Sequence, residues 1–89
     1  MITLEYFAQA KLAAGCDREE FEATAITGLD QLIEKSCAKH GDQLSSVLLN
    51  DGQLARWILV SVNGVATTDR NHALNDGDVV RLVSPISGG

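Results

Sequence analysis

The group with the clearest chemical potential lies in the last six residues, which read Ser84-Pro85-Ile86-Ser87-Gly88-Gly89. Glycine brings no side chain to a core and loses more backbone entropy on ordering than any other residue. It also lacks a Cβ, so a reactant can approach the α-carboxyl group of Gly89 closely. We interpret this carboxyl group as a reactive group. The alternative is that the two glycines are only a frayed chain end.

The cysteines and histidines predict no further reactive centre. Cys16 and Cys37 are 21 positions apart and form no CxxC pair. His40 and His72 do not complete a recognisable zinc spacing with them. We therefore expect no metal ion, and we interpret both cysteines as small apolar residues without a disulfide.

Length, composition and charge indicate one small globular domain. The chain has 89 residues, of which 45% are hydrophobic and 21% charged. Its longest apolar run, from Trp57 to Val60, is far shorter than the roughly 20 residues of a membrane-spanning helix, and we expect no signal peptide. The net charge of −5 and the few aromatic residues argue against a nucleic-acid partner. We expect a cytoplasmic protein.

The first half of the chain predicts a hairpin followed by a helix. Apolar and polar residues alternate from Ile2 to Phe7, as in a strand with one buried face, and residues 19–25 alternate more weakly. A helical apolar stripe runs over about residues 28–40. Thr27 and Asp30 have the spacing of a capping box at its start.

The second half predicts two strands and the turns that join them. Residues 57–62 are strongly β-prone and end at Asn63-Gly64, a pair that suits a tight turn. Residues 75–78 form another turn before a last strand over residues 79–83. Strands in two groups around one helix indicate an α+β fold, and a β-grasp with a mixed sheet is the natural candidate. We predict a domain over residues 1–84 and a flexible tail over residues 85–89.

Central pairing of the first and last strands would place side chains of both on the outer face of the sheet. Glu5 and Phe7 would share this face with Arg81 and Val83, while the helix covers the opposite face. We expect Phe7 and Val83 to form an apolar patch beside the start of the tail.

Trp57 and Leu59 are further candidates for this patch. The alternative for these two side chains is that the segment between residues 41 and 56 covers them.

Several segments, in the same order along the chain, resemble the MoaD/ThiS family of ubiquitin-like sulfur carriers, and within it the small subunit of molybdopterin synthase. They are Phe7-Ala8-Gln9-Ala10-Lys11-Leu12-Ala13-Ala14-Gly15, Val62-Asn63-Gly64, Leu74-Asn75-Asp76-Gly77-Asp78-Val79-Val80 and Pro85-Ile86-Ser87-Gly88-Gly89. Three positions depart from the family pattern: Lys11 and Leu12 stand where Arg and Glu are usual, and Ser84 where a second Pro is common.

The resemblance implies a carrier subunit rather than a complete enzyme. A carboxyl terminus with a pKa of about 3.3–3.7 is an anion at neutral pH and a poor electrophile, so it must be activated. The family implies that an E1-like enzyme adenylates Gly89 with ATP and that a sulfur donor system then converts it to a thiocarboxylate. The carrier itself binds no cofactor. In the molybdopterin branch, a large synthase subunit, in a heterotetramer, would receive the sulfur for the dithiolene of the pterin.

The tail residues suit this role. The five residues from Pro85 to Gly89 span at most about 17 Å, which is enough to enter a pocket of a partner. Pro85 ends the last strand, Ile86 is the one apolar anchor, and Gly88 leaves Gly89 open to attack. We expect Pro85, Ile86 and Ser87 to contact the partner.

Two other roles fit the same tail. A ubiquitin-like modifier would be joined to lysines of target proteins through an activated Gly89. A sulfur carrier for the thiazole of thiamine is less favoured, because such chains are typically shorter and lack the opening motif around Phe7. A β-grasp interaction module with an idle tail is the remaining alternative.

Overall fold

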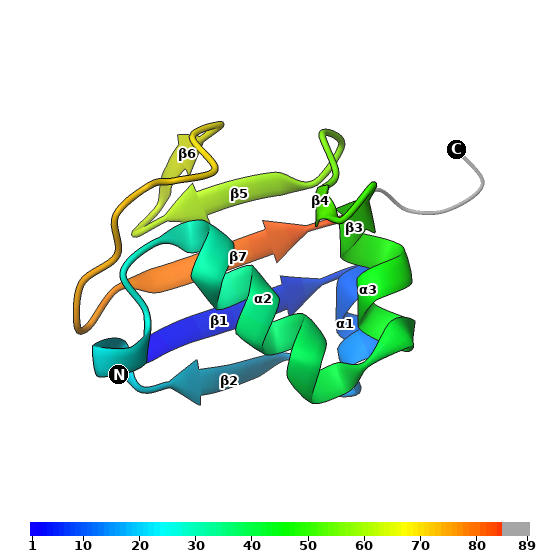
Figure 1. Ribbon diagram of the computed structural model, residues 1–89, viewed down its shortest axis with the longest axis horizontal. Helices are drawn as coiled ribbons and strands as arrows, with labels where there is room; N and C mark the ends of the chain where they lie inside the picture. The colour runs from blue at the N-terminus through cyan, green and yellow to red at the C-terminus, as the bar shows by residue number, and fades with distance from the viewer. Residues whose placement is uncertain (85–89) are drawn as a thin grey trace.

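The computed structural model describes residues 1–84 and contains a five-stranded mixed sheet, whose arrangement is shown in Figure 1. Its strands are β1 (Ile2–Phe7), β2 (Arg18–Phe21), β5 (Leu59–Val62), β6 (Val65–Thr67) and β7 (Val79–Val83). They lie in the order β2-β1-β7-β5-β6. The central strands β1 and β7 are parallel, and the other neighbouring pairs are antiparallel. The predicted pairing of the first and last strands is confirmed.

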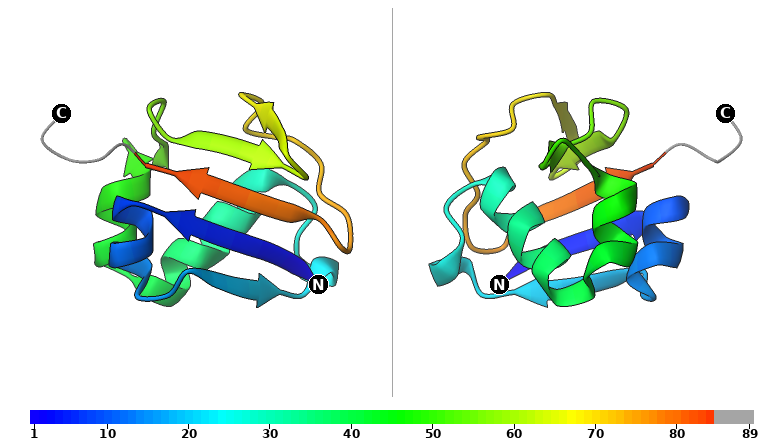
Figure 2. Two further views of the ribbon diagram at one scale, coloured as in Figure 1. Left: turned by 180° about the vertical axis from the view of Figure 1, so that it is seen from behind. Right: turned by 45° about the vertical axis from the view of Figure 1, so that its right-hand side comes forward.

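The helices cover one face of this sheet. They are α1 (Gln9–Ala14), α2 (Leu29–His40) and α3 (Asp42–Leu48), with a 3₁₀ turn, η1, at Ala23–Ala25 and a small hairpin of β3 (Leu49–Asn50) and β4 (Gln53–Leu54). Helix α2 crosses the sheet diagonally, and the opposite face is bare in the left view of Figure 2. This arrangement is the predicted β-grasp. None of the helices within residues 1–84 is long and apolar enough to cross a membrane.

The core lies between α2 and the sheet, as the apolar patterns predict. Ile2, Leu4 and Tyr6 of β1 are buried and alternate with residues that face the other side. The stripe of α2 is also buried, with Leu29 and Leu32 fully inaccessible to solvent. One face of each element is therefore removed from water, which is the main stabilising contribution.

Two predicted strands have different bounds in the structure. The second strand ends at Phe21 rather than at residue 25, because η1 follows it. The predicted strand over residues 57–62 begins only at Leu59, so Trp57 lies outside it. The sequence also did not predict α1, whose six residues are too few to show a helical apolar stripe.

The start of α2 is stabilised differently from the predicted capping box. Gly28 is the N-cap, and Gln31, three residues later, accepts hydrogen bonds through Oε1 from the backbone N–H and the hydroxyl of Thr27 at 2.7 and 2.8 Å. Asp30 is therefore not the partner of Thr27. The N-cap lies one residue later than Thr27, which moves the reciprocal contact from Asp30 to Gln31.

Two predicted turns are joined by the side chains of Asn63 and Asp78. Asn63-Gly64 forms the predicted two-residue turn between β5 and β6, with positive φ at both residues. The Nδ2 of Asn63 donates to Oδ1 of Asp78 at 2.9 Å, and its Oδ1 accepts from the N–H of Val79 at 2.9 Å. Oδ2 of Asp78 also accepts from the N–H of Asn75 at 2.8 Å. These bonds fix the start of β7 against the end of β5.

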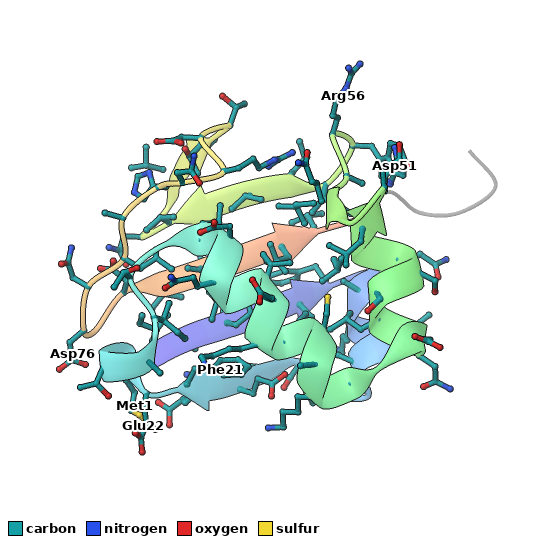
Figure 3. All side chains as sticks on the ribbon, in the orientation of Figure 1. Met1, Phe21, Glu22, Asp51, Arg56 and Asp76 are labelled. Atoms are coloured by element: carbon teal, nitrogen blue, oxygen red, sulfur yellow. The ribbon has the colours of Figure 1, made fainter. Side chains whose placement is uncertain are left out.

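The N-terminus is held at the same end of the molecule. The ammonium group of Met1 forms an ion pair with Asp76, and Figure 3 shows both residues at one corner of the fold. This ammonium group lowers the pKa of the Asp76 carboxyl. The backbone N–H of Gly77 also donates to the carbonyl of Met1 at 2.8 Å. The turn before β7 is thus fixed to the beginning of β1.

Candidate functional site

Three apolar side chains form a row across the bare face of the sheet. Phe7 is the register partner of Val83 on the parallel strand β1, and Leu59 is the partner of Val83 on the antiparallel strand β5. Paired residues on neighbouring strands share one face, so the three side chains lie next to one another. We call Phe7, Val83 and Leu59 the apolar row.

The apolar row is open to solvent and lies at the end of β7. Phe7 is 40% exposed, Val83 38% and Leu59 68%. The predicted joint position of Phe7 and Val83 is confirmed. The alternative that a loop covers Leu59 and Trp57 is wrong, because Trp57 is also 54% exposed.

Trp57 lies outside the strands that carry the row. It precedes β5 and lines a shallow hollow with Asn50 and Arg56. Arg56 extends away from the fold in Figure 3. From the sequence, Trp57 is a further candidate for the patch beside Leu59. However, β5 begins at Leu59, so Trp57 has no register partner on β7 as Leu59 has.

A polar row runs beside the apolar row. Glu5 and Arg81 are register partners, and Nε of Arg81 lies 2.7 Å from Oε1 of Glu5. Arg81 also lines a hollow of about 370 Å³ on this face, together with Arg56, Arg70, Leu59 and Val83. The bare face therefore combines apolar side chains with guanidinium groups, although the chain as a whole carries a net charge of −5. Apolar residues and arginine are both common in protein interfaces.

Ser84 fixes the point at which the chain leaves the sheet. Its side chain is buried, and its hydroxyl accepts a hydrogen bond from the N–H of Ala10 at 2.9 Å and donates to the carbonyl of Phe7 at 3.2 Å. Both partners are at the junction of β1 and α1. The residue that precedes the tail is thus held against the first strand and helix.

The same junction contains a residue in an unfavourable conformation. Ala8 has φ 58° and ψ −128° and precedes α1. This region of φ and ψ strongly favours glycine. The carbonyl of Ala8 accepts hydrogen bonds from the N–H groups of Lys11 and Leu12, which keeps it in place. This conformation allows the chain to turn from Phe7 directly into α1.

Sequence reasoning did not identify Ser84 as part of the site. The signal was present in the alternation of β7, in which Val80 and Leu82 point inward and Ser84 continues that series. A hydroxyl at an inward position has to find hydrogen-bond partners. The remaining predicted site residues, Pro85, Ile86, Ser87, Gly88 and Gly89, lie outside the described residues.

The sequence matches a known protein family over nearly all of its length. The sequence model of the ThiS family matches residues 4–89, and so includes the final glycines. No curated protein sequence matches the chain significantly.

Solved structures have the same fold. SAMP1, small archaeal modifier protein 1, from Haloferax volcanii has a TM-score of 0.84 and 26% identity, over 99% of this chain and 98% of that chain. Urm1 from Trypanosoma brucei has a TM-score of 0.80 and 26% identity, over 99% and 94%. A Pyrococcus furiosus protein provisionally named molybdopterin converting factor, subunit 1, has a TM-score of 0.71 and 26% identity, over 96% and 97%.

Proposed function

The chain belongs to the ThiS family of ubiquitin-like proteins, and we propose that it is a sulfur carrier, the small subunit of a molybdopterin synthase. Gly89 would carry the sulfur as a terminal thiocarboxylate and donate it to a pterin precursor that a large subunit holds. The observation that supports this proposal most directly is the position of Ser84. This residue anchors the start of the tail directly beside the exposed apolar row.

This geometry suits a group that has to be delivered to another protein. The apolar row can lose contact with water when a partner covers it, which contributes free energy to docking. The anchored Ser84 then sets the direction in which the tail starts, so docking of the sheet face also positions the tail. Once the domain has docked, Gly89 reacts within one complex, so the step becomes effectively unimolecular.

The chemistry would require two steps on Gly89. An E1-like partner would join the carboxylate to AMP from ATP, with release of pyrophosphate. A sulfur donor would then displace AMP and leave the thiocarboxylate. Neither step requires a side chain of the carrier to change its protonation state, so the described domain serves as the docking surface for both partners.

A modifier role is the second candidate. The TM-score with SAMP1 from Haloferax volcanii, 0.84, is higher than that with the Pyrococcus protein, 0.71. This difference favours the modifier role. In that role the activated Gly89 would form an amide bond with lysines of target proteins. The two roles share activation and differ in the group that attacks Gly89.

A reconstituted reaction distinguishes the two roles. The carrier with a terminal thiocarboxylate is mixed with the large synthase subunit and the pterin precursor, and dithiolene formation is measured against the amount of carrier consumed. We expect one sulfur transferred per carrier. If no dithiolene forms while cells accumulate lysine adducts of Gly89, the molybdopterin role is wrong and the modifier role is correct.

A further inference from the structure

Three side chains with metal-binding atoms meet at the edge of the sheet, away from the apolar row. Cys16 follows α1, Glu19 lies on the edge strand β2, and His40 is the last residue of α2. One nitrogen, oxygen or sulfur atom of each lies within 4.8 Å of the others. Oε2 of Glu19 lies 2.5 Å from Nε2 of His40 and 4.0 Å from Sγ of Cys16.

The types and spacing of these atoms suit one divalent ion. Thiolate, imidazole and carboxylate are all ligands of zinc, and the thiolate disfavours magnesium and calcium. Zinc bonds of about 2.0–2.3 Å in a tetrahedron place neighbouring ligand atoms about 3.3–3.8 Å apart. The separation between Glu19 and His40, 2.5 Å, is shorter than this range, and that between Glu19 and Cys16, 4.0 Å, is longer. Small side-chain movements would therefore bring the three ligand atoms to the spacing that zinc requires.

We infer that Cys16, Glu19 and His40 form a zinc-binding site that joins the edge strand to the end of α2. The three protein ligands leave a fourth position for water. None of its residues belongs to the apolar row, and the site does not depend on the proposed sulfur-carrier role.

The surrounding residues already orient the carboxylate ligand. The side chain of Glu19 is only 8% exposed, and the hydroxyl of Tyr6 donates to its Oε2 at 2.6 Å. Nζ of Lys39 lies 2.8 Å from the other oxygen, Oε1. A carboxylate oxygen has two lone pairs, so Oε2 can keep the bond from Tyr6 and accept a metal in place of His40. Outer hydrogen bonds of this kind hold metal ligands in position.

Tyr6 and His40 are also fixed relative to each other. The hydroxyl of Tyr6 lies 2.5 Å from Oγ of the buried Ser36 on α2. The ring of His40 packs edge-on against the ring of Tyr6, with centroids 6.0 Å apart and an interplanar angle of 88°. Two of the three ligands are therefore held near their binding positions by the core.

Charge and access are compatible with the ion. A thiolate and a carboxylate offset the two charges of Zn²⁺, and the imidazole is neutral when it binds. The ammonium group of Lys39 stays beside Oε1 of Glu19, so the occupied site carries one positive charge on a chain of net charge −5. His40 is 16% exposed at its side chain and Cys16 is partly exposed, so the ion can reach the site from solvent. Burial and the nearby Glu19 raise the pKa of the Cys16 thiol. Its proton is therefore released to solvent when the sulfur–zinc bond forms.

The spacing of the ligands explains why the sequence did not reveal the site. Cys16 and Glu19 are three positions apart, but the third ligand lies 21 positions further along the chain. One ligand is a glutamate, which the common cysteine and histidine patterns do not include. Only the packing of α2 against β2 brings His40 to the other two.

The test uses the full chain with a Gly89 carboxylate, so that the tail adds no thiol, after removal of metals with a chelator. Titration with Zn²⁺ in a calorimeter should give one ion per chain. Titration with Co²⁺ should give the near-ultraviolet charge-transfer band of a cobalt–thiolate bond, which reports Cys16 directly. A wild-type protein that takes up neither ion, or that takes up Co²⁺ without this band, overturns the proposal.

Matched variants identify the ligands. Cys16→Ala is compared with Cys37→Ala, and His40→Gln with His72→Gln, because each pair makes the same chemical change at a ligand and at a residue outside the cluster. We expect the two ligand variants to weaken zinc binding at least about tenfold and the controls to change it less than twofold. Equal losses in ligand and control variants contradict the assignment. Circular dichroism spectra in chelator verify that each variant is folded.

Discussion

The hydroxyl oxygen of Ser84 lies 2.9 Å from the backbone nitrogen of Ala10, a residue 74 positions earlier in the chain. This bond joins the end of β7 to the first turn of α1, and the bond from the Ser84 hydroxyl to the carbonyl of Phe7 fixes Ser84 relative to β1. Ser84 and the sheet face therefore form one structural unit.

Removal of the Ser84 hydroxyl should destabilise the fold. Ser84→Ala leaves the buried N–H of Ala10 without its acceptor, which costs about 1–3 kcal/mol in the free energy of unfolding. Urea unfolding followed by circular dichroism measures this loss. Ser46→Ala is the control, because Ser46 is exposed and bonds only within its own helix. A loss in Ser84→Ala no greater than in Ser46→Ala would contradict the anchoring role.

The conformation of Ala8 predicts that the same substitution has opposite effects at Ala8 and at Ala13. Ala8→Gly relieves a strained φ and ψ and should stabilise the protein by about 1 kcal/mol. Ala13→Gly, within α1, should destabilise it by about 1 kcal/mol, because glycine is a poor helix former. Thermal unfolding of both variants measures the difference. The same sign for both would show that Ala8 is not strained.

The bond between Asn63 and Asp78 predicts coupled effects. Asn63→Gly keeps the positive φ of the turn while it removes the side-chain amide, and Asp78→Ala removes the carboxylate. In a double-mutant cycle, the two changes should be non-additive by about 0.5–3 kcal/mol. Additive losses would mean that the two turns are stabilised independently.

The pH dependence of stability follows from the same pair. Hydrogen bonds from the N–H of Asn75 and the amide of Asn63 hold the pKa of Asp78 below its usual range. In acid the unfolded chain therefore binds a proton at this position more readily than the folded chain. This contribution to stability is complete above about pH 3.9. It is lost as the pH falls through the lower pKa of the folded state.

A pH series of urea unfolding measures this contribution. Asp78→Asn should flatten the acid limb of the curve, and Asn63→Gly should flatten it in part, because it removes one of the two bonds. An unchanged acid limb in Asp78→Asn would be evidence against the contribution of Asp78.

The apolar row should matter for docking and little for folding. Leu59→Asp places a charge at a residue that is 68% exposed, so the free energy of unfolding should change by less than about 0.5 kcal/mol. The rate of thiocarboxylate formation with the activating enzyme should fall at least about tenfold, because the charge loses its water when the partner docks. The measurement is mass spectrometry over time.

Val65→Asp is the matched control for this prediction. Val65 is 70% exposed, but it lies on β6 at the other end of β5 from Leu59. Equal rates for the two variants would show that the apolar row is not the docking surface.

The fold could be predicted from the sequence where a pattern was long enough. The alternation from Ile2 to Phe7 and the stripe of α2 predicted the core, and the parallel pairing of β1 with β7 placed Phe7 beside Val83. Helix α1 was missed because six residues show too little periodicity. The first turn of α2 was assigned the wrong partner because the boundary was off by one residue.

The parts of the sites that the sequence did not predict depend on contacts between distant segments. Ser84 bonds to Ala10, and His40 meets Glu19, only after the helices pack on the sheet. No local pattern encodes such a contact, since the partners are tens of residues apart. The reactive role of Gly89 stays a prediction, because it lies outside the described residues.

Intact-mass analysis of the protein isolated from cells detects the proposed thiocarboxylate of Gly89 directly. If Gly89 carries sulfur, part of the protein should be heavier by the difference between one sulfur and one oxygen atom, and fragmentation should place that difference on Gly89. A variant that lacks Gly88 and Gly89 should show no such species. The account is contradicted if the protein contains only the unmodified carboxylate under conditions in which the cells make the cofactor.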